Sequence, residues 1–104
     1  MTYIYKAPKK ESNYKQNQAL SKKLVYNTTR WMNLRRLKAI NTPLCEMCAE
    51  DGRVALVEEV HHIIPFLKGN DIEQIRTLAF DYENLMSLCS ECHTKIHKKI
   101  KNNN

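Results

Sequence analysis

The chain has 104 residues, a length that allows a single small domain. A domain of this size buries a modest share of its surface, so a metal or disulfide staple would help it fold. Seventeen Lys and Arg residues outnumber eleven Asp and Glu residues, which gives a net charge of +6 with neutral histidine. Residues 1–48 carry ten of the basic side chains and two acidic ones. This bias suits a polyanionic partner, and a solvated basic surface explains it equally well.

No apolar run is as long as a membrane span, and the N-terminus lacks the hydrophobic stretch of a secretory signal. We therefore expect a cytoplasmic protein with no membrane partner, whose thiols stay reduced.

Three parts of different composition follow one another along the chain. Residues 1–25 are polar and Lys-rich, which predicts a basic, partly flexible N-terminal arm. Residues 26–101 hold the hydrophobic periodicity and every Cys and His, so we expect them to form the folded domain. Residues 102–104 are predicted to be a disordered tail.

The first half of this domain begins with a helix. Residues 28–40 place Trp31 and Leu34 at helical spacing, after Asn27 or Thr28 as the cap. The sequence CEMC at 45–48 predicts a tight knuckle, and a turn at 50–53 then leads into a short strand over 54–57.

The second half carries the histidines. An extended segment over 59–64 holds His61 and His62 and ends at Pro65. A short helix is predicted over 71–79 and a loop over 81–84, and the last helix begins at Ser90 as its N-cap.

Two C-x-x-C pairs forty residues apart offer four thiolates to one ion. Four thiolates suit tetrahedral zinc, and a filled set of four leaves no open coordination position. The alternative is a set of disulfides, which the inferred reducing compartment disfavours. We therefore predict a structural zinc bound by Cys45, Cys48, Cys89 and Cys92.

The four histidines of the chain lie close to these cysteines in sequence. His61 and His62 are neighbours on a predicted strand and point to opposite faces, whereas His93 and His97 share one face of a predicted helix. One of the paired histidines with His93 and His97 could supply three nitrogens to a divalent ion, and the other would be free as a general base. Two alternatives stay open: a helix histidine replaces a cysteine at the zinc, or the helix pair simply faces solvent.

Several motifs together resemble a known family. VHHIIP at 60–65, NL at 84–85 and LCSECH at 88–93 resemble the HNH motif of the His-Me finger (ββα-metal) nucleases. CEMC and CSEC resemble the zinc clamp that many members carry. The stretch from Tyr26 and Asn27 through Trp31 to CEMCAEDGRV at 45–54 resembles the lead-in of the small phage-encoded HNH proteins found beside terminase genes. The resemblance implies a small α+β, single-domain ββα-metal fold with an N-terminal helix and zinc-stapled four-cysteine knuckles.

The resemblance also implies roles for individual residues. His61 takes the position of a metal ligand, and His62 that of the general base. Asn84 is the middle residue of the motif, which fastens the loop and helps to orient the base. His93 is the last motif residue and a metal ligand, and His97 matches an additional ligand of the bacterial colicin nucleases. One departure is the stretch between Pro65 and Asn84, which lacks the family's paired glycines and looks more helical.

The expected activity is therefore metal-dependent hydrolysis of double-stranded DNA by an HNH endonuclease, which leaves 5′-phosphate and 3′-hydroxyl ends. Imidazole ligands favour Mn²⁺, Ni²⁺, Co²⁺ or Zn²⁺ over Mg²⁺ as the catalytic ion. The ββα unit is expected at the minor groove of the DNA. Candidate phosphate contacts are Arg30, Arg35, Arg36, Lys95, Lys98 and Lys99.

Phage terminase subunits are further candidate partners, in the host cytoplasm, and the chain is expected to be a monomer or weak dimer. The rival interpretations are a non-catalytic zinc-knuckle DNA-binding module and a terminase adaptor. The first predicts one metal per chain and no nicking of plasmid DNA, and the intact set of histidines argues against it.

Overall fold

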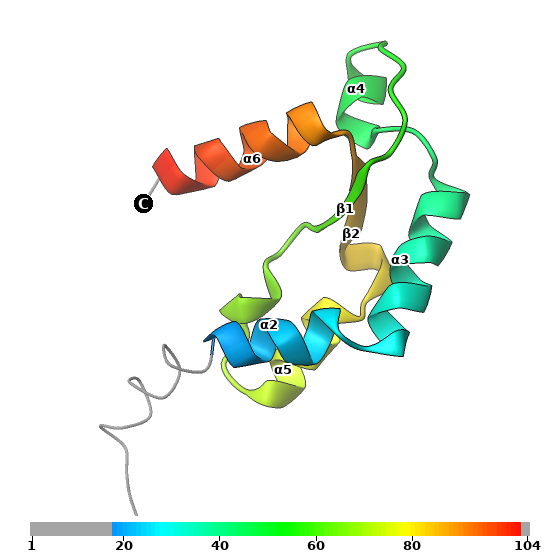
Figure 1. The fold of residues 1–104 in the computed structure, drawn as a ribbon. Helices are drawn as coiled ribbons and strands as arrows, with labels where there is room; N and C mark the ends of the chain where they lie inside the picture. Colours follow the sequence, from blue (N-terminus) through cyan, green and yellow to red (C-terminus); the bar gives the residue numbers. More distant parts are fainter. Residues whose placement is uncertain (1–17, 103–104) are drawn as a thin grey trace, which may run out of the picture.

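A two-stranded antiparallel sheet and the helix that follows it form the centre of the chain. The structure is a computed structural model that describes residues 18–102. Strand β1 (Glu59–His62) pairs with β2 (Leu85–Leu88), and α6 (Ser90–Asn102) begins two residues after β2 ends. Figure 1 shows α6 extending away from the sheet, on the side opposite to the long helix α3. This ββα order confirms the predicted α+β fold class.

The described part of the chain begins with the helices α2 (Gln18–Tyr26) and α3 (Thr29–Asn41). The Oγ1 atom of Thr28 accepts a hydrogen bond of 3.0 Å from the backbone N–H of Trp31, so Thr28 caps α3 as predicted. Helix α2 lies within the stretch that we expected to be an arm, and its Val25 side chain is buried. The rest of that arm, residues 1–17, lies outside the described residues, as do residues 103–104 of the predicted tail.

The first knuckle forms the short helix α4 (Glu46–Glu50), which ends in a turn with Gly52 at φ +76°. The strand predicted over 54–57 is wrong, because this segment makes only an isolated bridge between Leu44 and Leu56. Its backbone pairs with the residues just before Cys45, where the N–H of Cys45 donates to the carbonyl of Ala55 over 2.7 Å. Since α4 begins directly after Cys45, this pairing has no room to lengthen into a ladder.

The long connection between the two strands is mostly helical. It contains the 3₁₀ turn η1 (Phe66–Lys68), helix α5 (Ile72–Ala79) and the 3₁₀ turn η2 (Tyr82–Asn84). A carboxylate oxygen of Asp71 accepts the N–H of Gln74 over 2.8 Å, which caps α5 close to its predicted start. Strand β2 was not predicted from the periodicity of its residues.

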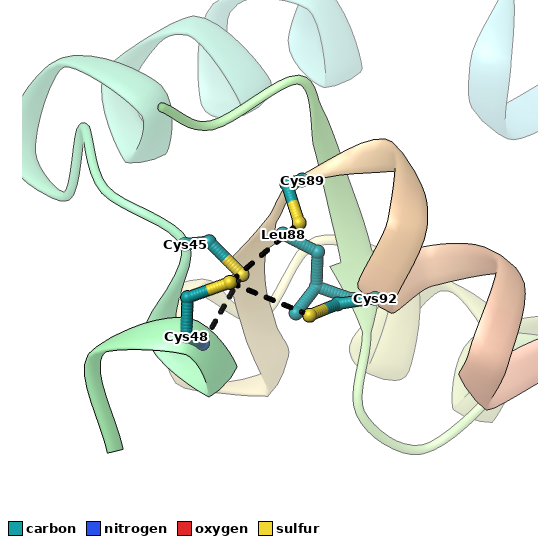
Figure 2. Packing of buried hydrophobic residues seen from close by; sticks show 5 residues of the cluster. All are labelled: Cys45, Cys48, Leu88, Cys89 and Cys92. Atoms are coloured by element: carbon teal, nitrogen blue, oxygen red, sulfur yellow. Dashed lines mark hydrogen bonds between the residues drawn. The ribbon is translucent and has the colours of Figure 1, made fainter. Parts of the chain in front are cut away.

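The buried residues form two separate clusters. Val25, Phe66, Ile75 and Ala79 pack α2 against η1 and α5. The other cluster surrounds the cysteines and includes Leu88, which is fully buried (Figure 2). The start of α6 belongs to the sulfur core through Cys92, and the sheet runs from this core toward the hydrocarbon core (Figure 1). Within residues 18–102, no helix combines the length and the apolar character needed to cross a membrane.

Candidate active site and metal centres

The four cysteine sulfurs meet between α4 and the first turn of α6 (Figure 2). All four residues are buried and unpaired by disulfides. The Sγ atom of Cys48 lies 3.8 Å from that of Cys89 and 3.7 Å from that of Cys92. Two sulfurs about 2.3 Å from one tetrahedral zinc ion are about 3.8 Å apart, so the spacing fits a zinc ion and is far too long for a disulfide.

Hydrogen bonds and burial act differently on the thiols of this cluster. Burial raises the pKa of the Cys45 thiol, but hydrogen bonds from Cys48, Cys89 and Cys92 outweigh it and bring the pKa to about 6. Burial, together with the neighbouring cysteines, raises the pKa of the Cys92 thiol to about 12. A cation among the sulfurs would replace the protons, as binding of zinc by thiolates requires.

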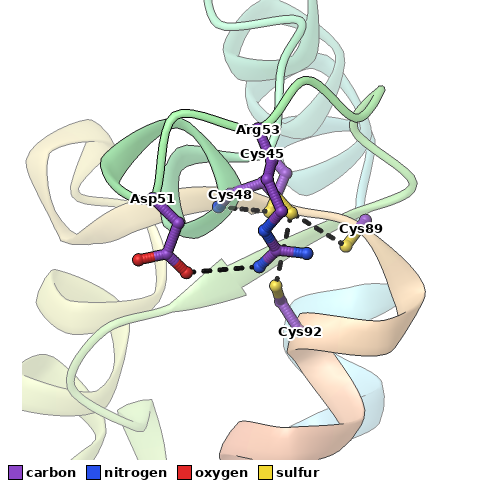
Figure 3. Close-up of polar contacts among 6 residues, drawn as sticks. All are labelled: Cys45, Cys48, Asp51, Arg53, Cys89 and Cys92. Atoms are coloured by element: carbon purple, nitrogen blue, oxygen red, sulfur yellow. Dashed lines mark hydrogen bonds and ion pairs between the residues drawn. The ribbon is translucent and has the colours of Figure 1, made fainter.

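Arg53 lies beside the sulfur cluster, and this neighbour was missed by the sequence analysis (Figure 3). Its guanidinium is 3.3 Å from the carboxylate of Asp51. The pKa of Arg53 is raised by this hydrogen bond and then by the charge of Cys48. A basic residue five positions after the second cysteine of the knuckle was the available signal. Arg53 places positive charge next to a site that becomes anionic when its thiols ionise.

Three histidines form a second convergent set, with His61 on β1 and the other two on α6. One ring nitrogen each of His61, His93 and His97 lies within 4.8 Å of the other two. The Nε2 atoms of His93 and His97 are 3.0 Å apart. Nitrogens about 2.1 Å from one ion are about 3.0 Å apart at a right angle, as in octahedral coordination, and about 3.4 Å apart in a tetrahedral one. The two nitrogens are therefore close enough to bind one ion together.

A carboxylate sets the tautomer of His93. The Nδ1 atom of His93 lies 2.8 Å from Oε1 of Glu59, on the neighbouring strand β1. An ionised carboxylate only accepts hydrogen bonds, so Nδ1 carries the proton and Nε2 keeps its lone pair toward His97. Glu59 was not singled out by the sequence analysis. The signal available was its place on strand β1, two residues before His61 and therefore on the same face.

The surroundings of His61 favour its neutral form. Burial lowers the pKa of His61, and the nearby His93 and His97 rings lower it further, to about 4. The His61 ring meets those of His93 and His97 edge-to-face, at centroid distances of 5.4 and 6.0 Å. A neutral imidazole has the lone pair that a metal ligand needs.

The side chain of His62 lies on the other face of β1, enclosed by aromatic rings. It is 6% exposed, with its ring stacked on Trp31 at 4.8 Å and edge-on to Phe66 at 5.0 Å. Its Nε2 lies 2.9 Å from the carbonyl oxygen of Ala79. A carbonyl can only accept, so Nε2 is protonated and Nδ1 carries the lone pair. Burial lowers the pKa of His62, and the hydrogen bond to Ala79 opposes this shift only in part, so burial favours the neutral ring.

Asn84 holds the loop around His62. Its side-chain hydrogen bonds, among the described residues, go to the backbone of this loop and not to the His62 ring. Its Oδ1 accepts the N–H of Ile64 over 2.9 Å, and its Nδ2 donates to the carbonyls of Ile64 and Leu78 at 3.0 and 2.9 Å. Leu78 directly precedes Ala79, whose carbonyl holds His62. Asn84 thus connects the end of β1 to the segment that orients the histidine.

The histidines open onto a surface concavity of about 410 Å³. Its walls come from β1, η1, α6 and α2, and they include all three convergent histidines and His62. Helix α2 contributes Lys22 and Tyr26, and burial raises the pKa of the Tyr26 phenol, which keeps it protonated. Lys22 was placed in the arm by the sequence analysis and so was missed as a pocket residue.

The six predicted phosphate contacts lie elsewhere on the surface. Arg30, Arg35 and Arg36 are exposed on α3, and the guanidinium of Arg30 lies 4.4 Å from the centre of the Phe80 ring. Lys95, Lys98 and Lys99 are exposed on α6. None of the six lines the histidine concavity.

A two-stranded sheet, a following helix, a closed sulfur site and an open histidine site together define a ββα-metal finger. Comparison with known proteins agrees: the HNH endonuclease family model matches residues 45–99. The chain belongs to the HNH endonuclease family and is a metal-dependent nuclease.

Two individual proteins are similar to it. A crystal structure of the HNH endonuclease of deep-sea thermophilic bacteriophage GVE2, with manganese ion, superposes with a TM-score of 0.66 and 25% identity, covering 96% of this chain and 98% of the phage protein. Anaredoxin of Nostoc sp. (strain PCC 7120) is 33% identical over 64 residues, which are 62% of this chain and 70% of anaredoxin.

Proposed function

We propose that the protein hydrolyses phosphodiester bonds of double-stranded DNA at the histidine concavity. The observation that carries this proposal is the convergence of His61, His93 and His97 within 4.8 Å at an open surface, in a concavity that His62 also lines. Three protein ligands leave coordination positions for water and phosphate, whereas the four buried cysteines leave none.

His62 is proposed as the general base. Its Nδ1 takes a proton from a water molecule, and the resulting hydroxide attacks phosphorus in line with the O3′ leaving group. The P–O3′ bond breaks and O3′ is protonated from solvent, which leaves 5′-phosphate and 3′-hydroxyl ends. A divalent ion on the three histidines would supply Lewis-acid stabilisation of the phosphate charge. Trp31, Phe66 and the Ala79 carbonyl hold the base in one orientation.

Different ions are proposed for the two donor sets. Zinc suits the cysteines because four thiolates at this spacing match its tetrahedral geometry. Manganese is the first candidate for the histidines, because imidazole ligands with open positions suit this ion and the phage GVE2 structure contains it. Ni²⁺, Co²⁺, Zn²⁺ and Mg²⁺ are the alternatives for this second site.

DNA is proposed to lie across the concavity with its minor groove toward the ββα unit. The exposed cations of α3 and α6 would contact phosphates on either side and supply affinity without sequence reading. The chain is proposed to act as a monomer or weak dimer in the host cytoplasm.

Plasmid nicking tests this function most directly. The purified protein is assayed on supercoiled plasmid with each divalent ion in turn, beside His62→Ala and His61→Ala. We expect His62→Ala to lower kcat by about 10²–10⁴-fold with DNA and manganese affinity retained, because only the base is lost. His61→Ala should lose both cleavage and manganese binding.

Thermal melting of both variants separates a chemical effect from unfolding, since His62 is buried. Cleavage by folded His62→Ala at the wild-type rate would refute the assignment of the base. Wild-type protein that binds one metal and nicks no plasmid with any ion would instead support the DNA-binding module.

A role beside a phage terminase is proposed as the biological setting. It is supported by the sequence resemblance of the segment before the first knuckle and by the similarity to a phage endonuclease. A pull-down with purified terminase subunits, scored together with the nicking rate, would detect a complex. If no terminase subunit binds the protein at micromolar concentrations, the proposed terminase role is wrong and the protein acts as a nuclease without this partner.

A further inference from the structure

We propose that Lys22 of α2 contacts the reacting phosphate and stabilises the charge that it gains during hydrolysis. This inference rests on the proposed function. Lys22 lines the same concavity as His61, His93 and His97, and it is the one Lys or Arg among the lining residues that the structure describes. The residue comes from a helix outside the ββα unit and outside residues 45–99, which the family model matches.

The packing of α2 presents Lys22 to the concavity. Ser21 and Val25 are four residues apart and form the buried face of the helix. Lys22 and Tyr26 are the next pair at the same spacing, and both line the concavity. Tyr26 fixes this edge, because its ring packs edge-on against Phe66 at 5.4 Å and Trp31 at 5.6 Å. Lys23 is exposed one position further around the helix and does not line the concavity.

The charges around the concavity allow the Lys22 ammonium to interact with a bound phosphate. The three convergent histidines carry no formal charge of their own when neutral, so the positive charge on their side of the concavity would be that of the ion they bind. A phosphodiester gains negative charge on its non-bridging oxygens as water attacks, and a second positive group would stabilise that charge further. The carboxylate of Glu59 is engaged with His93. Among the residues that the structure describes, no carboxylate forms an ion pair with Lys22. Its charge is therefore available to a phosphate.

Figure 1 shows the spatial basis of the proposal: α2 and α6 lie on opposite sides of the segment that leads from β1 into η1. A phosphate in the concavity would meet histidine nitrogens on one wall and Lys22 on another. An ordinary backbone contact, as proposed for the exposed cations of α3 and α6, strengthens DNA binding. A contact with the reacting phosphate strengthens as charge develops, and so it acts on kcat.

Single-turnover and steady-state nicking of plasmid in Mn²⁺, at saturating and limiting DNA, separate these roles. The variants are Lys22→Gln, Lys22→Arg and the matched control Lys23→Gln, which removes the same charge from the next position of α2. We expect Lys22→Gln to lower kcat by about 10–100-fold with a smaller change in KM, because a charged hydrogen bond to the reacting group is lost. Lys22→Arg should recover part of the rate, and Lys23→Gln should keep kcat within about twofold.

The outcomes distinguish this inference from the proposed function. If wild-type protein nicks DNA and Lys22→Gln changes only KM, or matches Lys23→Gln in kcat, the role of Lys22 is overturned and the nuclease stands. If wild-type protein nicks nothing with any ion, the proposed function fails and this role fails with it. Melting temperatures and bound zinc, measured for every variant, identify any that loses activity by unfolding. If Lys22→Gln unfolds, Lys22→Arg becomes the test: a folded Lys22→Arg protein with part of the wild-type kcat supports the role of Lys22, and one with the full wild-type kcat and a changed KM overturns it.

Discussion

The sulfur centre and the histidine centre share a helix but differ in almost every physical property. The four cysteines are buried, at most 7% exposed, and lie in a hydrocarbon environment with Leu88. The three histidines are half-buried or exposed and border a concavity of about 410 Å³. A closed donor set can only hold structure, whereas an open one can admit water and a phosphate. The difference shows that two donor sets close together in sequence can lie in different environments, one closed to solvent and one open to it.

The largest expected effect breaks the sulfur centre. Cys48→Ser should abolish the folded state in the absence of excess zinc, because structural zinc contributes roughly 10–16 kcal/mol in small domains. Circular dichroism and metal content by mass spectrometry measure the loss. His61→Ala is the contrasting variant and should keep both the fold and the zinc. A Cys48→Ser protein that melts like wild type would show that the sulfur centre does not hold the fold.

A smaller effect is expected from the carboxylate behind the histidine centre. Glu59→Ala removes the acceptor that fixes the tautomer of His93, and should lower manganese affinity or nicking about 10–100-fold. Glu59→Gln keeps an acceptor oxygen and should lose less. Glu50→Gln, on the exposed end of α4, is the control for loss of one negative charge. Manganese titration followed by nicking rates would test this order. Equal activity of Glu59→Ala and Glu50→Gln would mean that Glu59 does not position the ligand.

The smallest expected effect concerns the charge beside the sulfurs. Arg53→Gln should speed the loss of zinc to a chelator by about two- to fivefold, since the guanidinium is solvent-exposed and its interaction with the thiolates is screened. Release is followed by absorbance of a zinc-sensitive dye at low and high salt. The difference from wild type should shrink at high salt. A salt-independent difference would show that Arg53 acts through packing.

The sequence was sufficient to predict which cysteines and histidines group together, but not which residues pack around them. Paired C-x-x-C spacing and the alternation of His61 and His62 along a strand are local rules, and the structure follows both of them. The enclosure of His62 by Trp31 depends on packing between segments thirty residues apart, which periodicity cannot show. Trp31 lies at the helical spacing that we predicted and is buried, but its contact with the predicted base was not foreseen.

The errors have equally specific causes. Residues 54–57 have strand-like composition, but their partner is the short lead into α4, so only one bridge forms. Helix α2 has a weak pattern, with Ser21 and Val25 as its buried residues, and its packing partners come from η1 and α5. Tertiary contacts, rather than local sequence patterns, therefore determined the conformation of both segments. This is also why Lys22 was hidden inside a predicted arm.

The pairing of β1 with β2 assigns the two adjacent histidines to their different environments. His61 is opposite Met86 and His62 is opposite Leu85, and Asn84 ties the ends of this ladder together. Side chains on a strand alternate, so a slip of one residue would turn His62 toward His93 and put His61 against Trp31. The register of the two strands therefore determines which environment each histidine enters. Insertion of a single residue within β1 would move both imidazoles to the wrong face of the sheet, although both histidines would still be present in the chain.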